Sequence, residues 1–211
     1  MVKTRCNTGI LGTPHAFAVR VKLILLLAIL FTSAVPESGV VTAQTKSPSE
    51  YQVKAEYLYN FVKFTYWPSD TFVDPRQPIA VCIFGRDPFG HNLEVALLGK
   101  SVGDRPVMLA RATQIEDLSG CQIVFIAGSE IGRIPNLINR LHKRPVLLVG
   151  ETEGFAQLGG VIQFTVESAR VHLVINTDAA ARSGLKISSK LLALARIVRD
   201  SNQAADGSEL Q

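Results

Sequence analysis

Residues 121–150 read CQIVFIAGSEIGRIPNLINRLHKRPVLLVG and show the pattern of the whole chain most clearly. Two short apolar runs, residues 122–127 and 145–149, flank residues 130–141, whose apolar side chains recur every three or four positions. Short apolar runs that end near glycine are typical of buried strands, and the helical spacing is typical of a helix with one apolar face. The stretch therefore predicts a strand, a helix and a second strand of one sheet.

The rest of the chain continues this alternation. Apolar runs predict further strands at residues 79–84 and 106–110, and a hairpin at residues 161–166 and 171–176. Further helices are predicted at residues 53–65, 87–98, 177–183 and 188–199. Strands that alternate with helices favour the α/β class. We expect a single layered domain over residues 51–200, with a mixed, partly parallel sheet flanked by helices.

The predicted helix at residues 53–65 carries aromatic and aliphatic side chains at helical spacing, and we interpret this stripe as core packing. Trp67 precedes a proline and so marks the end of the helix, because that position avoids the helical conformation. Four polar side chains of the helix are expected to face water: Lys54, Glu56, Asn60 and Lys63.

The N-terminal region has the composition of an export signal. Four basic residues precede an unbroken apolar run, LILLLAILF at residues 23–31, and small residues follow at Val41 and Ala43. We predict a signal peptide at residues 1–43, with cleavage after Ala34 as the alternative. An uncleaved anchor is less favoured, because a membrane span needs about 20 apolar residues. A polar tether is expected at residues 44–50 and a disordered tail at residues 201–211.

Removal of the signal changes the charge of the protein. The full chain has 22 basic and 18 acidic residues, a net charge of +4. The mature chain would keep 18 basic and 17 acidic residues, a net charge of +1. This balance gives no indication of a nucleic-acid partner.

Two of the three cysteines, Cys82 and Cys121, would remain after export, in a compartment that permits disulfides. Cys82 lies inside the predicted strand at residues 79–84, and Cys121 lies at the entrance to the strand at residues 122–127. If these strands are neighbours, a disulfide between them is geometrically plausible. Two buried thiols that behave as small apolar side chains are the alternative.

The residues show no local catalytic or metal-binding motif: there is no phosphate-binding glycine loop, no nucleophile elbow and no metal-ligand spacing around a histidine. We therefore name no catalytic residue, and a secreted hydrolase is the least favoured function. Asp87 is interpreted as the N-cap of the helix at residues 87–98. Trp67, Asp87 and Phe89 are the candidates for lining a cleft that binds a small ligand.

Six blocks of the mature chain carry a family resemblance. They are VKAEYLYNFVKFTYWP (53–68), AVCIFGRDPFG (80–90), GDRPV (103–107), CQIVFIAGSE (121–130), LLVGETEGFAQLGGVIQF (147–164) and INTDAAARSGLKISSKLLALARIV (175–198). Together they resemble the YfiR family of periplasmic regulators, from Tyr51 to Arg199.

The resemblance implies an exported α/β protein that is not an enzyme, needs no cofactor and is commonly a homodimer. It implies repression of a membrane-bound diguanylate cyclase through the periplasmic part of the cyclase, which lowers cyclic di-GMP and disfavours biofilm. Other membrane sensors, such as histidine kinases, are alternative partners. A periplasmic small-ligand-binding protein that serves a different sensor is the alternative function.

The resemblance also bears on the cysteines. Cys82 and Cys121 match the positions of a family cysteine pair, which implies a disulfide between them. Some relatives carry a second pair where this chain has residues such as Ala156 and Gln163. The resemblance therefore implies a structural disulfide here rather than a redox switch.

Overall fold

The computed structural model describes residues 48–200. Its helices and strands, in chain order, are α2 (Glu50–Phe64), β1 (Thr65–Tyr66), β2 (Ile79–Phe84), α3 (His91–Leu97), β3 (Ser101–Val102), β4 (Arg105–Ala112), β5 (Ile123–Ile126), α4 (Ile134–Leu141), β6 (Leu147–Gly150), β7 (Ile162–Glu167), β8 (Arg170–Asn176), α5 (Thr177–Arg182), β9 (Lys186–Ile187), α6 (Ser189–Leu192) and β10 (Ala195–Val198). Short 3-10 turns at Ser69–Thr71, Ile115–Gly120 and Gly128–Arg133 complete the described elements.

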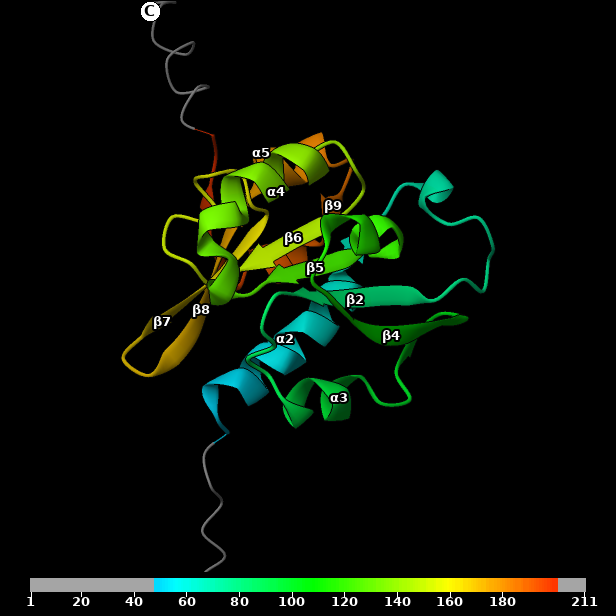
Figure 1. Ribbon diagram of the computed structural model, residues 1–211, viewed down its shortest axis with the longest axis horizontal. Coiled ribbons are helices and arrows are strands. Elements are labelled where there is room, and N and C mark those ends of the chain that lie inside the picture. The colour runs from blue at the N-terminus through cyan, green and yellow to red at the C-terminus, as the bar shows by residue number, and fades with distance from the viewer. Residues whose placement is uncertain (1–47, 201–211) are drawn as a thin grey trace, which may run out of the picture. The chain divides into compact units, whose positions relative to one another are not determined.

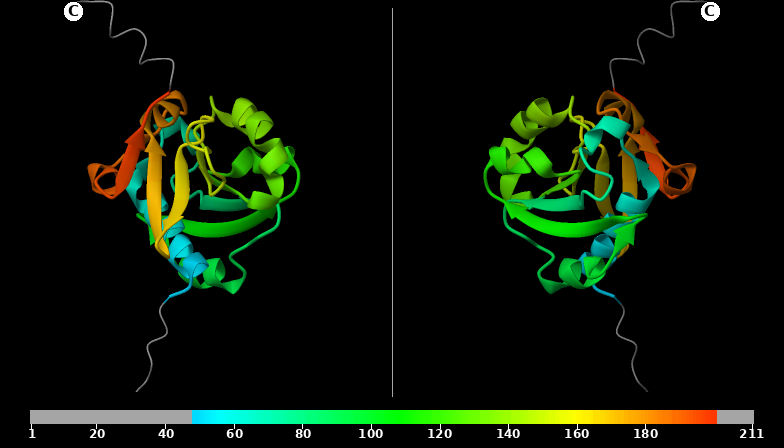
Figure 2. Two further views of the ribbon diagram at one scale, coloured as in Figure 1. Left: turned by 90° about the vertical axis from the view of Figure 1, so that its left-hand side faces the viewer. Right: turned by 90° about the vertical axis from the view of Figure 1, so that its right-hand side faces the viewer.

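Eight strands form one sheet in the order β10-β8-β7-β6-β5-β2-β4-β3. The neighbours are parallel except at β3–β4 and β7–β8. Helices α2 and α3 lie on one face of the sheet, and α4 and α5 lie on the other (Figure 1; Figure 2). The predicted α/β class, with a mixed and mostly parallel sheet flanked by helices, is confirmed.

The sheet face beneath α2 is packed with aromatic rings. Phe61 of α2 lies 5.6 Å from Phe164 of β7, centroid to centroid, and Phe125 of β5 lies 4.8 Å from Phe89 of the loop after β2. Tyr51 continues the row, with its ring centroid 5.4 Å from that of Phe89. The interpretation of the aromatic stripe of α2 as core packing therefore holds for Phe61, which is fully buried.

Helix α2 begins at Glu50, earlier than predicted, because Ser49 caps it. The Ser49 hydroxyl accepts a hydrogen bond from the backbone N–H of Gln52. A serine followed three residues later by glutamine is a helix-start signal. The apolar spacing begins only at Val53, so the sequence pattern alone places Glu50 in the tether.

Two other predicted helices are wrong in part. Residues 188–199 form only the four-residue α6, and Ala195–Val198 is a strand, β10, parallel to β8. The end of β10 is held extended by Asp200, whose carboxylate accepts a hydrogen bond from the buried Asn176 amide. The helix predicted at residues 87–98 begins only at His91, after Gly90, whose φ of 56° favours glycine.

At the hairpin and the cysteine pair, the structure agrees more closely with the predictions from the sequence. All of β7 pairs with Arg170–Ile175 of β8 around Ser168 and Ala169, both of which have positive φ, as the type I′ turn of a two-residue hairpin loop requires. Strands β2 and β5 are neighbours, and Cys82 and Cys121 form a disulfide with their Cα atoms 5.9 Å apart. Both cysteines are buried.

We expect that removal of this disulfide in a Cys82→Ala/Cys121→Ala variant lowers the free energy of unfolding by about 3–4 kcal/mol, because the bridge restricts a long loop of the unfolded chain. Urea denaturation of the oxidised wild type, the reduced wild type and the variant measures this difference. Equal midpoints for the oxidised wild type and the variant would contradict it.

Candidate functional site

The loops that follow β2, β5 and β6 gather at one edge of the sheet, because parallel strands end on the same side. The chain leaves β2 toward β4 and leaves β5 toward β6, in opposite directions along the sheet. In open α/β sheets, ligands bind outside the carboxyl ends of the strands where the connections diverge in this way. The N-terminal turn of α2 lies against the same edge, since Tyr51 and Lys54 both contact Glu151, which directly follows β6.

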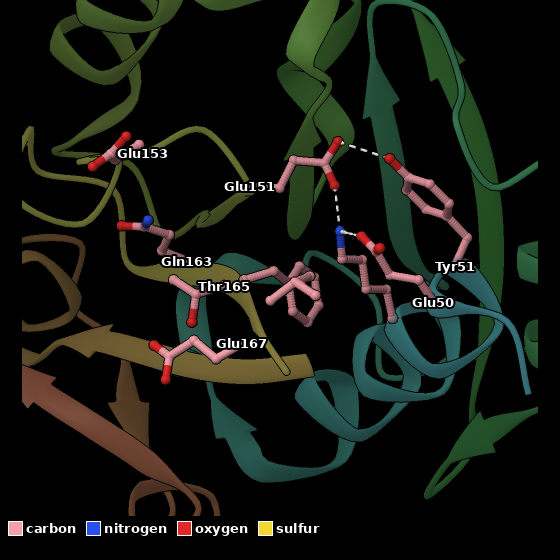
Figure 3. Close-up of a pocket in the computed structure, with 10 residues that line it drawn as sticks. Glu50, Tyr51, Glu151, Glu153, Gln163, Thr165 and Glu167 are labelled. Carbon is pink, nitrogen blue, oxygen red and sulfur yellow. Dashed lines mark hydrogen bonds and ion pairs between the residues drawn. The ribbon is translucent and has the colours of Figure 1, made fainter. Parts of the chain in front are cut away.

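A buried ion pair joins α2 to this edge (Figure 3). The Lys54 ammonium donates to Glu151 Oε2 at 2.6 Å and to the Glu50 carboxylate one turn earlier in α2. Only 3% of the Lys54 side chain is exposed, and its ammonium lies 4.7 Å from the centroid of the Tyr51 ring and 5.8 Å from that of Phe164. The expectation that Lys54 faces water is therefore wrong.

The surroundings keep the Lys54 ammonium charged. Burial acts to lower its pKa, but the hydrogen bonds and charges of Glu151 and Glu50 outweigh burial and raise the pKa above its ordinary value. The pKa of Tyr51 is also raised, by burial first and then by the negative charge of Glu151, to which the Tyr51 hydroxyl donates at 3.2 Å. Glu151 thus binds both the charged Lys54 ammonium and the neutral Tyr51 phenol.

An open hollow of about 450 Å³ lies beside this ion pair. Its residues come from α2, from the loop after β6 and from β7 (Figure 3). They are Glu50, Tyr51, Lys54, Glu151, Glu153, Gln163, Phe164, Thr165, Val166 and Glu167. Four carboxylates against one ammonium give this lining a net charge of −3. We call it the acidic groove.

A second hollow of about 390 Å³ shares Tyr51 and Glu151 with the acidic groove and extends to Arg86, Asp87 and Ser129. It lies at the point where the connections from β2 and β5 diverge. The Ser129 hydroxyl accepts from the backbone N–H of Arg86 at 2.9 Å and so holds the two loops together. We call this hollow the switch-point crevice.

Asp87 does not cap α3, contrary to the sequence interpretation. Its Oδ1 accepts from the backbone N–H of Phe89, and its Oδ2 accepts from Arg111 Nε of β4 at 2.8 Å. Arg111 also donates to Glu94 of α3 at 3.0 Å. Hydrogen bonds from His91 and then Arg111 lower the pKa of the exposed Glu94, and Asp87 and Glu94 raise that of Arg111. Asp87 thus holds the loop after β2 against β4.

The three candidate binding residues do not share a site. Asp87 lines the switch-point crevice, whereas Trp67 lines a separate hollow with Tyr66, Pro68, Gly184 and Lys186. The Phe89 side chain is only 1% exposed. Their role in binding stays a prediction.

Sequence reasoning missed Lys54 and Glu151 as site residues. The signals for them were present: Glu50 and Lys54 are four residues apart, and Glu151 directly follows the glycine that ends a predicted strand. In the part of the chain that the structure describes, no three His, Cys, Asp or Glu side chains gather as metal ligands. No helix of residues 48–200 is long and apolar enough to cross a membrane.

Fold and site together define an α/β domain built on a mostly parallel sheet, with charged side chains collected at its carboxyl edge. The family described as YfiR/HmsC-like matches residues 51–196, and the chain belongs to this family. The resemblance seen in the sequence is confirmed, and the protein is of the periplasmic regulator kind that this family represents.

Among solved structures, a conserved domain protein from Vibrio cholerae O1 biovar El Tor is similar, with 13% identity and a TM-score of 0.45. The alignment covers 71% of this chain and 60% of that one, so the chain spans three fifths of the length of that protein.

The Lys54 ion pair should matter for stability. We expect Lys54→Met to lower the free energy of unfolding by about 2 kcal/mol, because it leaves Glu151 and Glu50 close together without their cation. Combining it with Glu151→Gln should recover part of the loss, which a double-mutant cycle in urea measures. Lys63→Met, at an exposed position of the same helix, is the control. A Lys54→Met variant as stable as the wild type would exclude this role.

Proposed function

We propose that the mature domain represses a membrane-bound diguanylate cyclase by binding the periplasmic part of the cyclase. The observation that carries the proposal is membership of the YfiR/HmsC-like family over residues 51–196, which is nearly the whole described domain. The mechanism is a population shift: a regulator that binds only the inactive conformation of a sensor raises the share of that conformation. Release of the regulator then raises cyclic di-GMP.

The proposal includes export. Residues 1–43 act as a signal peptide, and the mature domain works where the Cys82–Cys121 disulfide can form. Cys82 and Cys121 are buried and bridge two central strands, so their disulfide acts on stability. The resemblance to the YfiR family implies that Ala156 and Gln163 stand where some relatives have a second cysteine pair. These features support a structural role for the bridge.

The test uses the exported full chain and the tagged mature chain. We expect the mature chain to capture an inner-membrane diguanylate cyclase from solubilised membranes, identified by mass spectrometry, and the exported chain to lower cellular cyclic di-GMP. The same chain without residues 1–43 stays in the cytoplasm and is the control, expected to leave cyclic di-GMP unchanged. A folded mature chain that captures no membrane sensor would refute the proposal.

Small-ligand binding is the second candidate function, and the switch-point crevice favours it. The crevice lies where α/β sheets bind ligands, and Arg86 is an exposed cation at its rim. Among residues 48–200 the Arg86 side chain makes no ion pair. A guanidinium of this kind suits a ligand that carries a carboxylate.

A thermal-shift screen of carboxylate-bearing metabolites tests this candidate. A ligand that binds the folded state raises the melting temperature, and Arg86→Gln should abolish the increase. Arg76→Gln, at an exposed arginine outside the crevice, is the matched control and should retain it. If no compound stabilises the wild type, the crevice does not bind carboxylate-bearing small ligands and this candidate function is refuted.

A further inference from the structure

Strand β7 has an open edge along the acidic groove. Strand β6 pairs with β7 only at Val149–Ile162 and Gly150–Gln163, and then the chain turns away into the loop that contains Glu151. Strand β7 continues to Glu167 with β8 alone as its neighbour in the described structure. The edge that β6 leaves uncovered is therefore Phe164–Glu167, and these four residues line the acidic groove.

The register shows which backbone groups face the opening. Glu167 and Arg170 close a two-residue hairpin, so they exchange backbone hydrogen bonds with each other. Because the direction alternates along a strand, Thr165 also turns its N–H and C=O toward β8, whereas Phe164 and Val166 turn theirs away from β8. The pairing of Gly150 with Gln163 uses the Phe164 N–H, so the groups left open toward the groove are the Phe164 C=O and the N–H and C=O of Val166. No backbone partner for these three groups comes from the loops of residues 48–200. Such a row of free donors and acceptors is a template for another strand.

The charge of the groove selects what can bind there. Glu153 and Glu167 are exposed, and within the described chain neither makes an ion pair. Glu151 and Glu50 already hold one ammonium, that of Lys54. A second copy of the same groove would bring like charges together, which disfavours edge-to-edge pairing of two copies. A basic segment meets complementary charge.

We infer that the acidic groove binds an extended basic segment of the partner protein. This segment pairs with β7 as an added strand, along the part of the β7 edge that β6 leaves unpaired. Backbone hydrogen bonds to the Phe164 C=O and to the N–H and C=O of Val166 supply affinity, and lysine or arginine side chains at alternate positions face the glutamates. Four residues of β7 offer about 13 Å of edge. The inference rests on the proposed function, since it names the element by which the sensor is recognised.

The edge is tested first with a defined probe. A short blocked peptide of alternating lysine and valine is titrated into the isotope-labelled mature chain and followed by amide NMR. We expect the largest shift at the amide of Val166, smaller shifts along the rest of Phe164–Glu167, and weaker binding at high salt. The same peptide with glutamate in place of lysine should not bind. No binding of the lysine peptide, or binding with shifts elsewhere, would overturn the inference.

Two sets of variants separate backbone pairing from charge. Val166→Pro removes an N–H that faces the groove and not β8, so the fold should tolerate it while peptide binding is lost. Val166→Thr keeps the N–H and should bind as the wild type does.

Glu153→Gln/Glu167→Gln should weaken binding about tenfold. Asp70→Asn/Asp104→Asn changes the net charge equally at exposed positions outside the groove and should leave binding unchanged.

Capture of the membrane cyclase by the same variants tests the inference about β7 separately from the proposed function. Capture by the wild type and Val166→Thr, but not by folded Val166→Pro or Glu153→Gln/Glu167→Gln, supports the inference. Equal capture by all of them overturns the inference and leaves the proposed function standing. If the wild type captures no cyclase while the peptide binds beside Val166, the proposed function fails and the groove remains a site for basic segments.

Discussion

A lysine ammonium held out of water between two carboxylates joins the first helix to the rest of the domain. Moving an ammonium from water into a protein is costly unless opposite charges and hydrogen bonds surround it. Glu151 and Glu50 supply both, and the rings of Tyr51 and Phe164 close the remaining sides. Because Glu151 directly follows β6, this one cluster sets the position of the N-terminal turn of α2 over the carboxyl edge of the sheet.

The acidic groove depends on that position. If α2 began elsewhere, the space beside β7 would open into solvent or be filled by the helix. Strand β6 ends at Gly150, where the ring of Phe155 packs so closely that a Cβ atom would lie 2.7 Å from it, so only glycine fits at this position. The early end of β6 leaves the edge of β7 free, and the ion pair places negative charge beside it. The free edge of β7 and the negative charge thus lie on the same surface.

The sequence predicts the strands at the centre of the sheet well, because residues buried on both faces form continuous apolar runs, as at 79–84 and 122–127. It fails where tertiary contacts override local pattern. Lys54 looks solvent-exposed by its type, and only Glu151, almost a hundred residues away, makes its burial favourable. Residues 195–198 resemble the end of a helix, yet pairing with β8 makes them a strand. The local pattern marks Lys54 and Glu151 as charged residues at notable positions, but it does not show that these two residues are partners.

Lys54 stays charged and shielded from water in the folded protein. The most direct measurement is NMR detection of the Lys54 ammonium hydrogens and nitrogen near neutral pH. Hydrogens held by Glu151 and Glu50 should exchange slowly enough to be seen, with the nitrogen shift of a charged ammonium, and Glu151→Gln should speed their exchange. An ammonium signal lost to rapid solvent exchange in the wild type, as for a lysine on the surface, would show that Lys54 is not shielded from water.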